Sequence, residues 1–301
     1  MSHLTAPDPA TASPQALIEA HEARGRRFTA AGVGSFVRES GTGSPVLLVH
    51  GASTSSFMYR RVLDELAARD LRGIAFDLPG QGLAARPPAD RFDYTWTGLG
   101  RYCAAAVDAL GLDTFHLVVH DIGGPIGFEL AAAMPDRIRS LTLLNTLLAV
   151  DRFKVPLFNR PFRTRGIGEL YLRSMTRTAF TQLGYRVTTD RASTSKAEMG
   201  AYYELLKRGD GGQGFLATMR GFELTAAKHA SWRATLSSAP YPIAAVWGSE
   251  DRVLAHDREG AAIRSEVPLV DFRLVPARHF VAEQQPEAVA EQVAMLARRV
   301  Y

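Results

Sequence analysis

Short apolar runs alternate with longer amphipathic stretches along most of this sequence. Each apolar run is too short for a helix and therefore favours a strand that is buried on both faces. The stretches between the runs repeat apolar residues at helical spacing, as in residues 56–69. Strands that alternate with helices predict a parallel sheet with helical crossovers. The predicted strands are residues 27–31, 35–39, 45–50, 73–77, 115–120, 139–144, 242–247 and 270–275.

The alternation stops after Asn145 and resumes only near residue 242. Between them the chain carries helix-like segments, many arginines and glycines, and no strong strand pattern. A helical insertion between two parts of one sheet explains this better than two independent domains. We therefore predict an α/β protein with a mostly parallel eight-stranded sheet, helices on both faces and an inserted helical cap. The predicted parts are an N-terminal tail and short helix (1–25), a core (26–146 and 236–301) and the cap (147–235).

Composition indicates an ordinary globular chain. Of the 301 residues, 46% are hydrophobic and 22% are charged. The net charge is +4 and the sequence has no block of basic residues, so no nucleic-acid partner is expected. The single cysteine, Cys103, excludes an internal disulfide and fits a reducing compartment. Residues 1–14 lack a signal peptide's apolar stretch, and no run is long enough to cross a membrane. We expect a cytoplasmic protein without a membrane partner, and the oligomeric state stays open.

A polar residue stands where the predicted strand 115–120 ends. Asp121 follows that strand, and Gly123 and Gly124 separate it from a helical pattern beginning at Ile126. This is the strand–turn–helix context of a nucleophile elbow, where serine is the usual central residue. A carboxylate that attacked a carbonyl would form a reactive anhydride, whereas attack on a saturated carbon forms an ordinary ester. Asp121 therefore indicates displacement at an sp3 carbon; the alternative is that it only caps the following helix.

Two further polar residues follow predicted strands near the C-terminus. Asp251 comes just after the strand 242–247, and His279 just after the strand 270–275. Functional residues gather at the carboxyl ends of parallel strands, so we expect both residues beside Asp121. His279 is then the base and Asp251 the acid that orients it, with Glu250 as the alternative acid.

The segment that follows the strand 45–50 is expected to complete the site. Gly51 allows the backbone to turn tightly, so the amide of Ala52 can point inward. With the amide of Ile122 it would form an oxyanion hole. His50, Gly51 and Gly123 are expected to support these two turns.

These motifs resemble a known superfamily. Residues 50–56 (HGASTSS), 77–82 (DLPGQG) and 120–124 (HDIGG), with the order nucleophile, acid, histidine, resemble α/β-hydrolases of the Asp-nucleophile branch, which contains haloalkane dehalogenases and epoxide hydrolases. The resemblance covers residues 28–299 and is weakest in the cap. It implies the α/β-hydrolase fold and a two-step reaction. Asp121 displaces the leaving group to form an ester, and His279, oriented by Asp251, activates the water that hydrolyses it.

The leaving-group donors differ from the family pattern. Haloalkane dehalogenases hold the halide with an Asn and a Trp, where this chain has Ala52 and Ile122, whose side chains cannot donate. Epoxide hydrolases use cap tyrosines, although they commonly carry proline at the position of Ser53 here. The tyrosines that the cap offers are Tyr202 and Tyr203, which we favour, together with Tyr171 and Tyr185.

The sequence thus predicts a hydrolase that opens an epoxide. The alternatives are a dehalogenase-like hydrolase without the usual halide donors, and a non-hydrolytic member of the fold, such as a cofactor-free oxygenase, a luciferase-like protein or a ligand-binding protein. The expected partners are a small apolar organic substrate and water. No cofactor or metal is expected.

Overall fold

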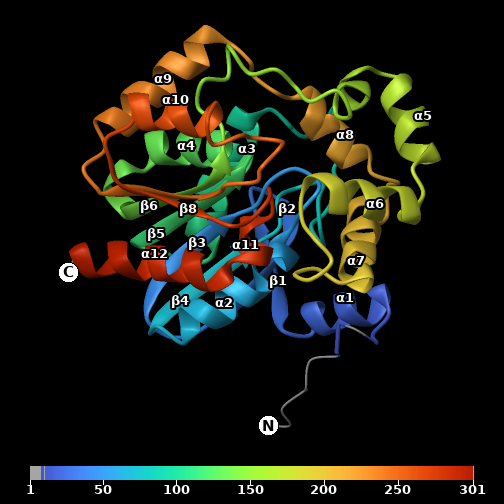
Figure 1. Cartoon of the computed structure of the whole chain (residues 1–301), viewed down its shortest axis with the longest axis horizontal. Helices are drawn as coiled ribbons and strands as arrows, with labels where there is room; N and C mark the ends of the chain where they lie inside the picture. Colours follow the sequence, from blue (N-terminus) through green and yellow to red (C-terminus); the bar gives the residue numbers. More distant parts are fainter. Residues whose placement is uncertain (1–7, 10, 301) are drawn as a thin grey trace.

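The strands build one sheet that extends through the centre of the molecule (Figure 1). The structure is a computed structural model that describes residues 8–9 and 11–300, so part of the predicted tail, at 1–7 and 10, lies outside the described residues. Within them the sheet has eight strands in the order β1-β2-β4-β3-β5-β6-β7-β8. The pairs β1–β2 and β2–β4 are antiparallel, and the other neighbours are parallel. The strands are β1 (Gly25–Ala30), β2 (Val33–Ser40), β3 (Ser44–Val49), β4 (Leu71–Phe76), β5 (Phe115–Asp121), β6 (Ile138–Thr146), β7 (Ile243–Gly248) and β8 (Leu269–Val275).

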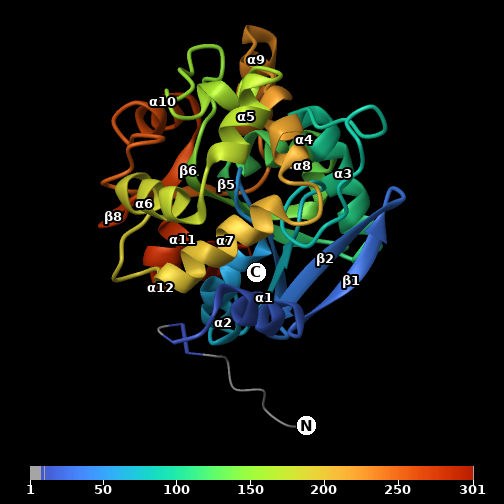
Figure 2. The same ribbon diagram turned by 90° about the vertical axis from the view of Figure 1, so that its right-hand side faces the viewer.

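The predicted fold class is confirmed. Each apolar run identified in the sequence forms a strand close to its expected bounds. The central strands β3 and β5 are buried almost throughout, because helices cover both faces of the sheet (Figures 1 and 2). The carboxyl ends of the parallel strands therefore meet at one edge, where polar residues can gather without disturbing the core.

Two apolar cores lie on opposite faces of the sheet. One joins it to α3, α4, α9 and α10, and the other joins it to α1, α2, α11 and α12. No helix in the described part of the chain is long and apolar enough to cross a membrane. The bounds are α1 (Pro14–Glu22), α2 (Arg60–Ala67), α3 (Trp96–Ala109), α4 (Gly123–Ala133), α9 (Ala226–Ser237), α10 (Glu259–Glu266), α11 (Val281–Gln284) and α12 (Pro286–Arg299).

The segment between β6 and β7 is helical. Its helices α5 to α8 gather on one side of the molecule, beside the sheet (Figure 1). Side chains cap two of them: Thr176 accepts a hydrogen bond at the start of α6, and Ser195 forms a capping box with Glu198 at the start of α7. The elements are η3 (Arg160–Arg163), α5 (Ile167–Ser174), α6 (Arg177–Val187), α7 (Lys196–Lys207) and α8 (Gln213–Arg220).

The packing of α9 places the end of the cap before the predicted boundary at residue 235. Trp232 on α9 is buried against Phe128 of α4 and Trp96 of α3, within the main core. Its indole N–H donates to Glu129 of α4 at 2.7 Å. Helix α9 therefore packs as part of the core. From here on, "cap" means the helices α5 to α8 with η3.

Candidate active site

Asp121 lies at a sharp turn between β5 and α4. Its φ of 52° is in the left-handed region, which side-chain-bearing residues rarely adopt outside functional turns. Glycine is required beside it, because a Cβ on Gly123 would lie 2.5 Å from the carbonyl oxygen of Val49, and one on Gly51 would lie 2.5 Å from the Cβ of Asp121. The hydroxyl of Thr146 supports the turn by donating to the carbonyl of Asp121 at 2.6 Å.

Backbone amides hold the carboxyl group of Asp121. The N–H of Ala52 donates to Oδ2 at 2.9 Å, and the N–H of Ile122 also lowers the pKa of the carboxyl group. The other oxygen, Oδ1, lies 3.8 Å from Nε2 of His279, too far for a hydrogen bond. Burial raises the pKa of Asp121 above its ordinary value, against the opposing influence of His279 and the two amides.

His279 and Asp251 form a hydrogen-bonded pair. Nδ1 of His279 lies 2.9 Å from Oδ2 of Asp251, so the imidazole presents Nε2 to Asp121. Burial by itself would lower the pKa of His279, but the charge and hydrogen bond of Asp251 and the charge of Asp121 outweigh it and raise that pKa. Of the two candidate acids, Asp251 faces His279, whereas Glu250 is exposed and lies 3.9 Å from Arg278.

The carboxylate of Asp251 is held on both oxygens. Oδ1 accepts the backbone N–H groups of Val253 and Leu254, at 2.7 and 3.0 Å. Burial would raise the pKa of Asp251, but the charge of His279 and the hydrogen bonds that the carboxylate accepts lower it overall. Asp251 is therefore ionised at neutral pH and orients the imidazole.

Sequence reasoning missed Asn145, the residue where the strand pattern stops. Its amide donates to Oδ2 of Asp251 at 2.6 Å, and its oxygen accepts the N–H of Gly248 at 3.0 Å. Its φ of 35° is also left-handed. A polar residue at the carboxyl end of a buried strand, beside the strand that leads to Asp251, is the signal that could have found it.

Replacing Asn145 with alanine is expected to destabilise the fold by about 2–4 kcal/mol, because it removes two buried hydrogen bonds and one of them reaches a charged group. Denaturant unfolding measures the change, and Asn159→Ala in the half-buried cap segment is the matched control. An equal, small effect of both substitutions would contradict this role.

Two histidines support the neighbouring turns. Leu78 donates its N–H to Nε2 of His50 at 3.0 Å, so Nδ1 of His50 carries the proton and donates to the carbonyl of Gly51 at 2.9 Å. His120, whose role the sequence did not indicate, donates from Nε2 to the carbonyl of His279 at 2.9 Å. Burial, chiefly, lowers the pKa of His120 to about 3, so its ring stays neutral. Both histidines are buried and hold backbone near the pair of Asp121 and His279.

A small cavity of about 70 Å³ lies between the cap and the turn after β3. Its wall is mainly apolar, with polar groups from Ser53, Asn159 and Thr188. Ser53 directly follows Ala52, which binds Asp121, and Phe280 directly follows His279, so two lining residues are chain neighbours of the Asp121 group, although Asp121 and His279 do not themselves line the cavity. The side chain of Asp121 is 14% exposed, which leaves its carboxyl group accessible. The apolar wall includes Phe158, Phe162, Met175, Phe180, Phe215 and Phe280.

The four cap tyrosines do not line this cavity, and their role as leaving-group donors stays a prediction. Tyr202 is buried, and its hydroxyl is bound to Glu283 of α11. Tyr203 donates to the carbonyl of Met175 at 3.0 Å, and Tyr185 donates to that of Thr194 at 3.1 Å. Tyr171 packs against the ring of Phe162. Helical periodicity alone could not show on which side of the cap each ring lies.

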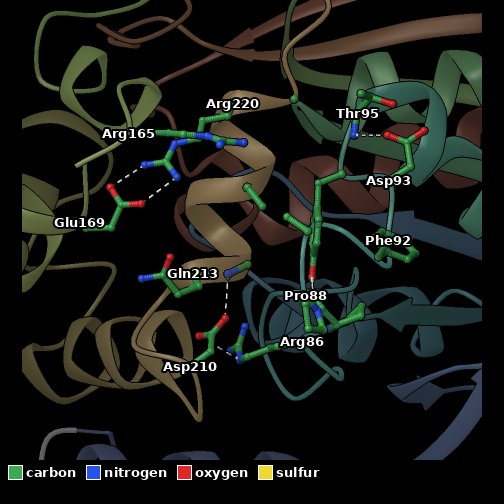
Figure 3. A pocket seen from close by; sticks show the side chains of 16 residues that line it. Arg86, Pro88, Phe92, Asp93, Thr95, Arg165, Glu169, Asp210, Gln213 and Arg220 are labelled. Carbon is green, nitrogen blue, oxygen red and sulfur yellow. Dashed lines mark hydrogen bonds and ion pairs between the residues drawn. The ribbon is translucent and has the colours of Figure 1, made fainter. Parts of the chain in front are cut away.

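A larger cavity, with a volume of about 720 Å³, lies on the other side of α8. Figure 3 shows Arg220 paired with Glu169, and Asp210 beside Arg86. Arg220 binds both oxygens of Glu169, at 2.9 and 2.8 Å, and Arg86 lies 3.7 Å from Asp210. None of its lining residues belongs to the group around Asp121. In residues 8–9 and 11–300 no three His, Cys, Asp or Glu residues are arranged to hold a metal ion.

Comparison with known proteins agrees with this fold. A family model described as the alpha/beta hydrolase fold matches residues 44–286. Haloalkane dehalogenase 2 of Mycobacterium tuberculosis is 29% identical over 265 residues, which cover 85% of this chain and 88% of that protein. Among solved structures, wild-type Cfl2 from Burkholderia cenocepacia has a TM-score of 0.79 at 23% identity, covering 92% of this chain and 95% of that one. Epoxide hydrolase VrEH1 from Vigna radiata has a TM-score of 0.72 at 20% identity, covering 91% and 98%.

The sheet, the turn at Asp121 and the nearby histidine define a protein of the α/β-hydrolase class. The chain belongs to the α/β-hydrolase fold family, in agreement with the match that covers most of its length. The predictions of the α/β-hydrolase superfamily and of an enzyme are confirmed.

Proposed function

We propose that this protein hydrolyses a small apolar substrate by displacement at a saturated carbon, with Asp121 as the nucleophile. The observation that carries the proposal is the different setting of the two oxygens of Asp121. Oδ2 is held by the N–H of Ala52, whereas Oδ1 faces Nε2 of His279. One oxygen can thus attack while the other stays in a site suited to developing negative charge.

In the first step, Oδ1 forms a bond to the substrate carbon. The bond from that carbon to the leaving group breaks, and its electron pair goes to the leaving group. The product is an ester of Asp121 whose carbonyl oxygen is Oδ2. The burial of Asp121, whose side chain is 14% exposed, favours this step, because it removes much of the water that would otherwise solvate the attacking carboxylate.

In the second step, His279 takes a proton from water through Nε2, and the resulting hydroxide adds to the ester carbon. Negative charge then develops on Oδ2, where the N–H groups of Ala52 and Ile122 stabilise it. Asp251 stabilises the imidazolium that forms. The intermediate collapses as the bond to the alkoxide breaks, and the departing alkoxide takes the proton from His279. Asp121 is left as a carboxylic acid, which releases its proton to solvent and becomes the carboxylate again.

We propose an epoxide as the substrate class. Ala52 and Ile122 provide no side-chain donors for a departing halide, whose buried charge would be costly without them. The opening of an epoxide is driven in part by ring strain, and its oxygen stays attached to the product. The cavity wall offers the side-chain donors of Ser53 and Asn159, whereas the hydroxyl of Thr188 already donates to the carbonyl of Gly184 at 3.0 Å. A haloalkane is the second candidate, which the similarity to a haloalkane dehalogenase favours.

A panel of small epoxides and haloalkanes tests the substrate class. Diol formation is measured for the first group and halide release for the second, at equal substrate concentrations. We expect diol formation from epoxides and little halide release. Halide release without diol formation would replace the first candidate with the second, and turnover of neither group would count against both.

The pH dependence of the second step follows from the raised pKa of His279. The base must be neutral, so we expect ester hydrolysis to be slow in acid and to accelerate through an ionisation above 6.5, the ordinary value for histidine. The substitution Asp251→Asn removes the negative charge that raises the pKa of His279, whereas burial still lowers that pKa. The ionisation should therefore move to lower pH, and the maximal rate should fall. Decay of the ester in single-turnover experiments measures both. An ionisation unchanged by the substitution would contradict the assignment of Asp251.

A further inference from the structure

Both chain neighbours of His279 are bonded to one end of a cap helix. The N–H of Phe280 donates to the carbonyl of Thr188 at 2.7 Å. The guanidinium of Arg278 donates to the carbonyl of Thr189 at 2.7 Å and also to that of Tyr185. The turn that carries the base is therefore attached to the cap on either side of His279.

These bonds fall where helix α6 ends. The last carbonyls of a helix have no partner within it, so a cation placed there satisfies them and interacts favourably with the helix dipole. Arg278 occupies that position. Gln284 completes the attachment, since its side chain accepts the N–H of Arg278 at 2.7 Å and donates to Asp190.

The same end of α6 forms part of the cavity wall. Gly184, Val187 and Thr188 line the cavity, as does Phe280. The Phe280 ring lies against His120, whose imidazole bonds to the carbonyl of His279. One short piece of cap is thus both a wall of the substrate cavity and a support of the base. Asp121, in contrast, is held by β5 and by the turn at Ala52, both of which belong to the core.

We propose that Arg278 is a positioning residue for His279, which fixes the imidazole relative to the cap and so controls the second step of the reaction without affecting the first. This proposal rests on the proposed function. Attack by Asp121 needs no contribution from Arg278, because the carboxylate is placed by core elements. Activation of water needs Nε2 at a defined point, and a misplacement of about 1 Å can cost about 100-fold in rate.

A core arginine that bonds to a different part of the cap provides the matched control. Arg86 also joins core to cap, donating to the carbonyls of Leu205 at 2.6 Å and Gly82 at 3.0 Å. Figure 3 shows it beside Asp210, in the cavity of about 720 Å³, and His279 is not among the residues that line that cavity. Loss of Arg86 should weaken cap attachment without moving the base.

The experiment compares Arg278→Gln, Arg278→Lys and Arg86→Gln with the parent protein. Rapid-quench kinetics gives the rates of ester formation and ester hydrolysis on the substrate found in the panel, intact mass detects the ester, and melting temperature reports stability. In Arg278→Gln we expect hydrolysis to fall about 10-fold or more, ester formation to be unchanged and the ester to accumulate. Lysine keeps the charge but not the planar fork, so Arg278→Lys should restore part of the rate. Arg86→Gln should lower only the melting temperature.

The outcomes separate this proposal from the function it rests on. Equal slowing of both steps in Arg278→Gln, or a change in melting temperature alone, overturns the positioning role and leaves the mechanism intact. If Arg278→Gln does not fold, the ratio of the two rates in Arg278→Lys decides in the same way. Absence of any ester in His279→Gln overturns the covalent mechanism, and the positioning role with it.

Discussion

Asp121→Asn is expected to lower turnover on the order of 10⁶-fold, the scale of loss seen when a hydrolase loses its nucleophile. The amide has nearly the same shape as the carboxylate, so the hydrogen bond from Ala52 can persist, but a neutral amide does not attack a saturated carbon. Turnover is measured on the best substrate of the epoxide and haloalkane panel. Asp136→Asn, at an exposed acid, is the matched control and should retain activity.

A labelling experiment makes the result specific to the mechanism. In a single turnover in heavy-oxygen water, the parent protein should incorporate one label into the carboxylate of Asp121, because water attacks the ester carbon of the enzyme. Label found only in the product would show direct attack by water on the substrate. Full physiological activity in Asp121→Asn would favour the third candidate, a non-hydrolytic or ligand-binding member of the fold.

His279→Gln is expected to stop the reaction at the ester. The first step needs only the carboxylate of Asp121, whereas the second loses its general base, which contributes about 10²–10⁴-fold. Intact mass after incubation with substrate should show the protein plus the alkyl group, and the added mass identifies the substrate class directly. For an epoxide the whole molecule is added, whereas for a haloalkane the halogen is absent.

The matched control for this variant is His256→Gln, since His256 is the other histidine near the C-terminus and no hydrogen bond joins it to the residues of the site in the described structure. It should turn over normally and show no added mass. Turnover by His279→Gln at the parent rate, with no adduct, would show that His279 is not the base. If the ester accumulated in both variants, its accumulation would not be evidence that His279 is the base.

Local pattern was enough to predict the strands and the turn at Asp121. The residues of β5 are apolar and end at an acid followed by two glycines, and each feature depends only on neighbours in the chain. The closeness of Asp121, His279 and Asp251 was also expected, because parallel strands bring their carboxyl ends together. The roles of these three residues stay proposals until the variants are measured.

Side-chain direction in the cap could not be read from periodicity. Tyr202 has the residue type that an epoxide hydrolase needs, yet its hydroxyl is bound to Glu283, within a buried group that includes Arg60 and Glu198. The orientation of the Tyr202 side chain depends on ion pairs between α2, α7 and α11, which are distant in sequence. Periodicity also could not predict the packing of α9 on α4, since this packing depends on the contact of Trp232 with Phe128 in the core.

The sequence by itself determined the sheet, the helical insertion and the acid at the turn after β5, because strand burial and turn geometry are properties of short segments. Only the tertiary structure decided which groups support that chemistry. Asn145 meets Asp251, and Arg278 meets the end of α6, through contacts between segments far apart in the chain. Such contacts form where the strands and the cap converge, and their partners depend on the packing of the whole chain.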